Sequence, residues 1–218
     1  MSSSCVVNSI NNYTHSITIK GEFIEPLYES ITKIIPHSYL DSETNSIIFN
    51  AERIKSLKPF LFKQTNKKLS HFQIIQLIHD LSKQINILHM LGFAFYGFDI
   101  DNILTIDDKF VFVSDKYLRP IVDDCIIFYS PMIKPYFSSP EIINLHSLPS
   151  KISYKTSYYS LAVLVVFCIF NKYLLVANEI KDEEEINLIV KPIHDTKLYY
   201  FIKRCLHHDI DKRILLLI

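Results

Sequence analysis

The segment from Ser70 to Gly92 constrains the fold more than any other part of the chain. Its large apolar side chains recur at a spacing that places them on one stripe of a helix. These side chains are Ile75, Ile78, Leu81, Ile85 and Leu88. Ser70 suits the N-cap of such a helix, and Gly92 suits the position just past its end. We therefore expect a long amphipathic helix that must bury this stripe against other elements.

The sequence before this helix is rich in strand signals. "HSITIK" alternates and ends at Lys20, and "SYLDSETNSIIFNAERI" contains two strands joined by a polar turn at residues 42–45. A short helix is expected after Pro26 in "GEFIEPLYESITKII". Residues 1–14 are rich in Ser and Asn and lack periodicity, so they are expected to form a disordered N-terminus.

The sequence after the long helix becomes mainly helical. "NILTI" and "KFVFVSD" alternate like a hairpin around Asp107 and Asp108. Residues 158–170 are strongly apolar and residues 199–206 form a further helical segment. This order predicts an α+β protein with two unequal lobes, a small strand-rich one at residues 15–56 and a larger, mainly helical one at residues 57–218.

Composition excludes several classes of partner. Lys and Arg together number 23 and so do Asp and Glu, so no overall charge draws the chain to nucleic acid or to acidic membranes. The apolar run from Leu161 to Phe170 is too short to cross a bilayer. The four cysteines are widely separated and form no CxxC pair, which indicates neither a zinc site nor a disulfide framework. The expected location is the reducing cytoplasm, and the expected partner is a protein.

Several short motifs follow one another at characteristic separations. "LHMLGF" precedes "FYGFDIDNIL", and Asp115 lies 13 residues after Asn102. "SSPE", "YYSLAVLV" and "CLHHDIDKR" come later in the chain. From about Asp41 onward this series resembles the eukaryotic protein kinase superfamily. The matching family motifs are LHxxGI, HRDLKPENIL, the Asp of DFG, APE, DxWSLGVLL and CLxxDPxxR. The resemblance implies a protein-kinase-like fold whose N-terminal lobe is reduced.

The resemblance also implies roles for individual residues. Asn102 and Asp115 stand at the two metal-binding positions of the family, where oxygen ligands hold Mg²⁺ against the phosphates of ATP. "ITIK" resembles the strand motif VAIK and makes Lys20 the candidate phosphate-binding lysine, with Glu25 or Glu29 as its helix partner. Further along the chain, Glu141 and Arg213 correspond to a buried ion pair that ties the activation segment to the late helices.

Other family positions are changed. The catalytic carboxylate is expected five residues before Asn102, where this chain has Gly97, and glycine cannot accept a proton. Asp99 is the nearest substitute. Ser157 replaces the Asp that supports the catalytic loop in the family. Lys116 and Tyr117 follow Asp115 instead of Phe and Gly, and residues 1–20 contain no glycine to form a phosphate-covering loop.

These losses favour a pseudokinase, a kinase-like binding or regulatory module that retains ATP and Mg²⁺ as ligands. The first alternative is a divergent active serine/threonine kinase that transfers the γ-phosphoryl group of ATP to protein. The second is an intracellular α+β interaction protein outside the kinase superfamily. The composition, typical of an AT-rich genome, and the chain end soon after Arg213 resemble reduced kinase-like proteins of large DNA viruses or of some protists.

Overall fold

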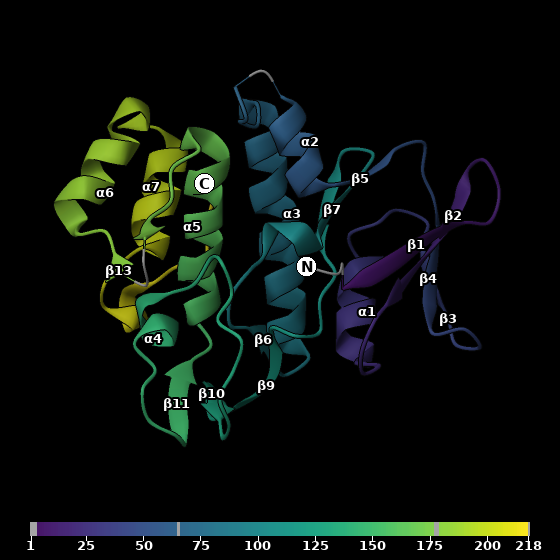
Figure 1. Ribbon diagram of the computed structural model, residues 1–218, viewed down its shortest axis with the longest axis horizontal. Helices are drawn as coiled ribbons and strands as arrows, with labels where there is room; N and C mark the ends of the chain where they lie inside the picture. The colour runs from purple at the N-terminus through teal and green to yellow at the C-terminus, as the bar shows by residue number, and fades with distance from the viewer. Residues whose placement is uncertain (1–3, 65, 177–178, 218) are drawn as a thin grey trace.

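The computed structural model describes residues 4–64, 66–176 and 179–217. Its architecture is α+β, as the sequence predicts, and the sheets are antiparallel. Figure 1 shows one four-stranded sheet and a helix at one end of an elongated molecule, with most of the helices at the other. The buried apolar residues of both ends belong to one continuous core.

The first end of the molecule is built on a four-stranded sheet in the order β1-β2-β4-β3. The strands are β1 (Cys5–Ser9), β2 (Thr14–Ile19), β3 (Tyr39–Asp41) and β4 (Ser46–Asn50). Helix α1 (Glu25–Thr32) begins beside Pro26 and buries Leu27 and Ile31. Ile17, Ile47 and Phe49 are buried on the sheet, so alternation along β2 and β4 supplies this part of the core.

Two expectations for this region are corrected. Residues 5–9 are not disordered, because they pair along their whole length with β2, from Cys5 opposite Ile19 to Ser9 opposite His15. Residues 1–3 of the expected disordered terminus lie outside the described residues. Strand β5 (Ile54–Ser56) falls within the expected first lobe, yet it pairs with β7 of the second.

Helix α3 (His71–Met90) is the long amphipathic helix that the sequence predicts. Ser70 caps its first turn by accepting a hydrogen bond from the Gln73 N–H, and the Gln73 side chain accepts one from the Ser70 N–H. Ile78, Leu81, Ile85 and Leu88 are fully buried and Ile75 is half-buried; Ile74 and Leu77 are buried too. Helix α3 itself lies near the centre of the molecule (Figure 1).

Two polar side chains interrupt the buried face of α3 and position the neighbouring hairpin. This hairpin consists of β7 (Ile103–Ile106) and β8 (Lys109–Phe112) and turns at Asp107. Gln84 donates to the Phe112 carbonyl at 2.9 Å and accepts from the Phe112 N–H at 2.9 Å. Asp80 accepts a hydrogen bond from the Phe110 N–H at 3.0 Å. The free edge of β8 is thus satisfied by helix side chains in place of another strand.

The remaining elements surround α3. Helix α2 (Leu57–Lys63) lies before it in the chain, and β6 (Phe93–Phe95) follows it. A second four-stranded sheet, in the order β11-β10-β9-β6, adds β9 (Leu118–Val122), β10 (Cys125–Phe128) and β11 (Ser150–Ser153). The other helices are α4 (Pro140–Ile143), α5 (Thr156–Phe170), α6 (Glu183–Val190) and α7 (Lys197–Cys205). A two-stranded ribbon, β12 (Leu175–Val176) with β13 (Glu179–Ile180), precedes α6.

Helix α5 is apolar around its whole circumference because it is enclosed by protein on all sides. Its residues from Thr156 to Cys168 are buried, and Asn171 ends it in the left-handed conformation. In the part of the chain that the structure describes, no helix is long and apolar enough to cross a membrane.

Candidate functional site

The loop at residues 95–98 is packed into the core. Phe95, Tyr96 and Phe98 are each at most 1% exposed. The Phe95 and Phe98 rings contact Phe112 edge to face, with centroids 4.9 Å and 5.1 Å away. The Tyr96 hydroxyl donates to the Lys116 carbonyl at 3.0 Å. These aromatic side chains therefore hold the loop against the core.

Gly97 lies against a second segment of chain. A Cβ atom placed on Gly97 would stand 2.4 Å from Pro135 Cγ and 2.9 Å from the Phe137 carbonyl oxygen. Phe98 and Phe137 exchange both of their backbone hydrogen bonds, at 2.9 and 3.0 Å, which fixes the two segments together. No side chain fits at position 97 unless this contact opens. The space that a side chain at position 97 would need is filled by Pro135.

Asp99 serves the local backbone. It caps the short 3₁₀-helix at Ile100–Asn102, and its Oδ1 accepts a hydrogen bond from the Asp101 N–H at 3.2 Å. Burial, and after it the negative charge of the adjacent Asp99 carboxylate, raise the pKa of Tyr117 to about 12. Asp101 in turn pairs with Lys58 at 2.9 Å. The Asp99 carboxylate therefore has two local roles: it caps the 3₁₀-helix and it interacts with the Tyr117 hydroxyl.

Asn102 is buried at the end of that 3₁₀-helix, where its side chain meets the N-terminal segment of the chain. Its Oδ1 accepts a hydrogen bond from the Ser4 N–H at 3.2 Å. The Ser4 hydroxyl also lies 3.1 Å from the hydroxyl of Ser114, and both serines are buried. Ser4 thus bridges Asn102 and Ser114, and Ser114 is the residue before Asp115.

Asp115 meets the turn that follows β2. Its Oδ2 accepts a hydrogen bond from the Glu22 N–H at 3.3 Å, and a Cβ atom on Gly21 would stand 2.1 Å from the same oxygen. Gly21 has φ +124°, a conformation open to glycine and strained for other residues. Burial raises the pKa of Tyr28, and the negative charge of Asp115 raises it further, so this hydroxyl also borders the carboxylate.

Lys20 connects the Ser4 contact with the turn at Gly21 and Glu22. Its backbone N–H donates to the Ser4 carbonyl at 2.7 Å, and its side chain is exposed. Among the described residues, Lys20 pairs with neither Glu25 nor Glu29, both of which are exposed. The structure brings Lys20, Asn102 and Asp115 into one neighbourhood through Ser4 and the 21–22 turn. We call this set of residues, Ser4, Lys20–Glu22, Asn102, Ser114 and Asp115, the polar junction.

A groove of about 490 Å³ adjoins the polar junction. Cys5 follows Ser4 along one wall, and Leu104 lies two residues after Asn102 on the other. The lining residues come from β1, β2, the segment around β5 and β7: Cys5, Val7, Ser9, His15, Glu52, Ile54, Lys55, Ser56 and Leu104. An open, partly apolar groove beside clustered polar groups has the general form of a small-molecule site.

Two oxygens of the polar junction suit a divalent cation. Asp115 Oδ1 is buried and accepts no hydrogen bond from any described residue, which is an uncommon state for a carboxylate oxygen. Asn102 Oδ1 is the second candidate ligand, and hard cations prefer such oxygens. The Ser4 N–H uses one of the two lone pairs of the Asn102 oxygen and would compete with a cation there. Within the described residues, no group of three or more His, Cys, Asp and Glu side chains is placed to hold a metal.

The expected ion pair between Glu141 and Arg213 is present. The guanidinium donates to the two carboxylate oxygens at 3.1 and 2.6 Å, and the Arg213 side chain is 0% exposed. It also lies over the Tyr159 ring, 4.8 Å from the centroid, and donates from Nε to the His207 carbonyl at 2.9 Å. The pair joins α4 to the chain after α7. Ser157, by contrast, donates locally to the Tyr154 carbonyl at 2.9 Å.

Sequence reasoning missed three residues of this region. Ser4 carries no sequence signal, because its partners Asn102 and Ser114 are about a hundred positions away in the chain. Gly21 and Gln84 do offer one, as a glycine at a strand end and a polar residue within an apolar helical stripe.

Comparison with known proteins adds no relative. No protein-family model matches the chain. No curated protein matches it significantly.

Proposed function

We propose that this chain is a protein-kinase-like protein without phosphotransfer activity that acts by binding another protein. The series of motifs from "LHMLGF" to "CLHHDIDKR" supports the kinase-like assignment. The bidentate Glu141–Arg213 pair supports it independently, because the resemblance implied this contact between residues that are 72 positions apart.

The enclosure of Gly97 is the observation that carries the loss of activity. Phosphoryl transfer to a hydroxyl group uses a carboxylate within hydrogen-bond reach of that hydroxyl. Gly97 has no side chain, and Pro135 fills the space where one would lie. Asp99 does not replace it, because it caps a 3₁₀-helix and lies beside Tyr117.

ATP with Mg²⁺ is the proposed ligand of the polar junction. Asn102 and Asp115 would hold the metal, which when bound neutralises phosphate charge, and Lys20 would contact a phosphate. The unpartnered Asp115 Oδ1 supports this role. The Ser4 N–H competes with the cation for the Asn102 oxygen, so binding should be stronger when the N-terminal segment withdraws.

A phosphotransfer assay tests the loss of activity. Radiolabelled ATP, Mg²⁺ and a generic protein substrate are incubated with the wild type, with Asp115→Asn and with Glu43→Gln, a control at an exposed turn. We expect the label transferred by all three, to the substrate or to the chain itself, to equal the blank without protein. Transfer by the wild type and by Glu43→Gln that Asp115→Asn abolishes would instead identify a divergent active serine/threonine kinase.

A further inference from the structure

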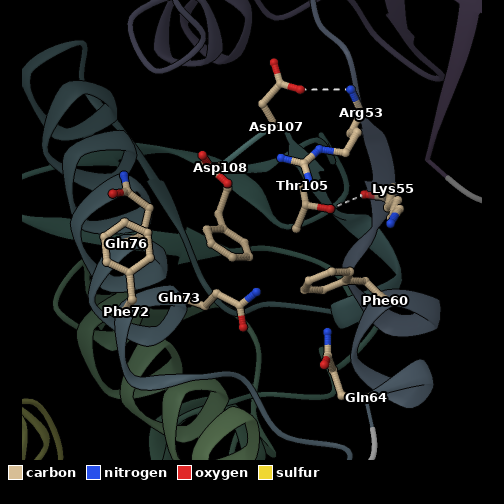
Figure 2. Close-up of a pocket in the computed structure, with 11 residues that line it drawn as sticks. Arg53, Lys55, Phe60, Gln64, Phe72, Gln73, Gln76, Thr105, Asp107 and Asp108 are labelled. Atoms are coloured by element: carbon tan, nitrogen blue, oxygen red, sulfur yellow. Dashed lines mark hydrogen bonds between the residues drawn. The ribbon is translucent and has the colours of Figure 1, made fainter.

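A second cavity lies away from the polar junction, between α2, the start of α3 and the β7–β8 hairpin. We call it the α2–α3 pocket, and its volume is about 170 Å³. Figure 2 shows the side chains of Arg53, Phe60 and Gln73 pointing toward one space between the helices and the hairpin. The lining consists of Arg53, Lys55, Phe60, Gln64, Phe72, Gln73, Gln76, Thr105, Asp107, Asp108 and Phe110. None of these residues has a part in the proposed kinase-like chemistry.

Three aromatic side chains line the α2–α3 pocket. Phe110 is buried, Phe60 is half-buried, and Phe72 is 68% exposed at the first turn of α3. A ligand ring between Phe60 and Phe72 would remove apolar surface of both from water. A cavity of about 150 Å³ is known to accommodate benzene, so the space here is sufficient for one six-membered ring.

Two cations stand on one side of this space. Within the described chain, the Arg53 guanidinium forms no ion pair and donates no hydrogen bond. Figure 2 shows this side chain extending across the pocket in the direction of Asp108. The Lys55 ammonium lies 5.6 Å from the centroid of the Phe60 ring, so a second positive charge borders the aromatic wall. An anion at this edge would give Arg53 the bidentate partner that it lacks.

The two carboxylates of the pocket differ in availability. Asp107 accepts hydrogen bonds from the N–H groups of Glu52 and Arg53, at 3.1 and 2.8 Å, and is committed to the turn. Asp108 is exposed and forms no ion pair with any described residue. Its negative charge attracts Arg53 and repels a bound anion without direct contact. Removing the Asp108 charge should therefore strengthen anion binding.

The glutamines add hydrogen-bonding capacity. Gln73 uses its Oε1 to accept from the Ser70 N–H, which leaves its amide N–H groups as donors. Gln76 donates to Asp80 at 2.8 Å and keeps its oxygen free. Gln73 therefore has N–H donors left for an acid, and Figure 2 shows its amide directed into the pocket.

We propose that the α2–α3 pocket binds a small aromatic carboxylate. The ring lies among Phe60, Phe72 and Phe110, and the carboxylate lies at Arg53 and Lys55. This ligand offers a ring to the aromatic lining and a negative charge to the unpaired Arg53 guanidinium. The inference does not depend on nucleotide binding at the polar junction, since it uses none of the same residues.

Ligand-observed NMR titration with phenylacetate tests the proposal on the full chain. We expect a Kd of about 1 mM, as is usual for a ligand with so few atoms. Acetate supplies the charge without the ring, and benzyl alcohol and phenethylamine supply the ring without the negative charge. We expect each of these to bind roughly tenfold or more weakly, since each lacks one half of the recognition.

Variants assign the binding to this pocket. Arg53→Gln should weaken phenylacetate roughly tenfold, because the charge-assisted hydrogen bonds are lost. Asp108→Asn should strengthen it, and Lys63→Gln, an exposed cation of α2 outside the lining, should leave it unchanged. Absence of phenylacetate binding, or equal binding of phenylacetate and phenethylamine, would overturn the proposal. Binding of the dipeptide acetyl-Asp-Phe-amide without binding of phenylacetate would also overturn it, in favour of a protein ligand.

Discussion

At the scale of single residues, glycine is required at position 97 by the close contact with Pro135. The absence of a side chain allows the 95–98 loop and the 135–137 segment to touch, since Pro135 Cγ would be 2.4 Å from a Cβ atom. We predict that Gly97→Asp destabilises the protein by about 1–3 kcal/mol, the usual cost of overpacking, and restores no phosphotransfer. Urea denaturation measures the first effect and the radiolabel assay measures the second.

A double-mutant cycle with Pro135 provides the control. In a Pro135→Gly background, Gly97→Ala should cost less than in the wild type, because glycine lacks the two proline ring atoms, Cβ and Cγ, that make two of the three close contacts. Strict additivity of the two substitutions would contradict the proposed contact. Stable folding of Gly97→Asp together with transferred label would contradict the loss of activity.

His89 makes stability depend on pH. It packs against the Tyr154 and Tyr158 rings, with centroids 4.6 and 5.7 Å away, and no described residue bonds its buried Nε2. Burial lowers the pKa of His89 from 6.5 to about 4. As the pH falls, His89 therefore becomes protonated in the unfolded chain at a higher pH than in the folded protein. The free energy of unfolding should fall between pH 6.5 and pH 4, by a total on the order of 3 kcal/mol.

The measurement compares urea denaturation of the wild type and His89→Gln at several pH values. The difference between them isolates His89 from the other eight histidines. The wild type should lose its advantage over the variant as the pH drops below 6.5. A difference that stays constant down to pH 4 would mean that His89 is not held neutral in the fold.

Residue positions that depend on spacing could be predicted, and those that depend on distant contacts could not. Counting from Asn102 led to Gly97 and to Asp115, and the structure puts Asn102 and Asp115 in one neighbourhood. Ser4 escaped notice because a serine near a chain end is typical of a disordered segment. Its hydrogen bond to Asn102 spans 98 positions, and no local pattern reports such a contact.

At the scale of elements, periodicity predicted the most regular segments and missed the second four-stranded sheet. The apolar stripe of α3, the β7–β8 hairpin and the apolar α5 all lie where their patterns indicate. Strand β1 was missed because "CVVNS" is short and is followed by Ser and Asn residues, so pairing with β2 decides its structure. Gln84 stands out as a polar residue in the apolar stripe of α3, but local periodicity does not identify β8 as its partner.

The contact between Gln84 and Phe112 should be important for the stability of α3 and its hairpin. Gln84→Leu leaves the N–H and carbonyl of Phe112 buried without their partners, and an unsatisfied buried group costs about 1–3 kcal/mol. We therefore predict a loss of roughly 2–4 kcal/mol in the free energy of unfolding, measured by urea denaturation. Asn86→Leu, at an exposed position of the same helix, should change it by less than about 0.5 kcal/mol. Equal effects of the two substitutions would argue against this contact.

At the scale of the whole molecule, the N-terminal segment and α1 connect the two ends of the core. Ser4 reaches Asn102 and Ser114, and the 21–22 turn reaches Asp115. Helix α1 is joined to α3 by hydrogen bonds from Lys83 to the Lys33 carbonyl and from Gln84 to Ser30. Any ligand that uses Asn102 and Asp115 together must therefore compete with contacts that hold the molecule together.

This competition predicts opposite behaviour for two substitutions at one position. Ser4→Pro removes the N–H that occupies Asn102 Oδ1, whereas Ser4→Ala keeps it and removes only the hydroxyl. If the polar junction binds ATP with Mg²⁺, freeing this oxygen should tighten binding, because the chain no longer has to break its own hydrogen bond first. We expect a gain of roughly five- to tenfold in affinity for Ser4→Pro over Ser4→Ala, about the value of one hydrogen bond.

Isothermal titration of both variants with ATP and Mg²⁺ measures this difference, and the same titration of Ser4→Pro/Asp115→Asn provides the control. The double variant should lose the gain, since it lacks the carboxylate that would share the cation. Equal affinities of Ser4→Pro and Ser4→Ala would show that Asn102 takes no part in nucleotide binding. The titration measures binding and not catalysis, so its outcome is independent of the phosphotransfer assay. A chain can bind nucleotide at the polar junction and still be inactive because it has Gly97.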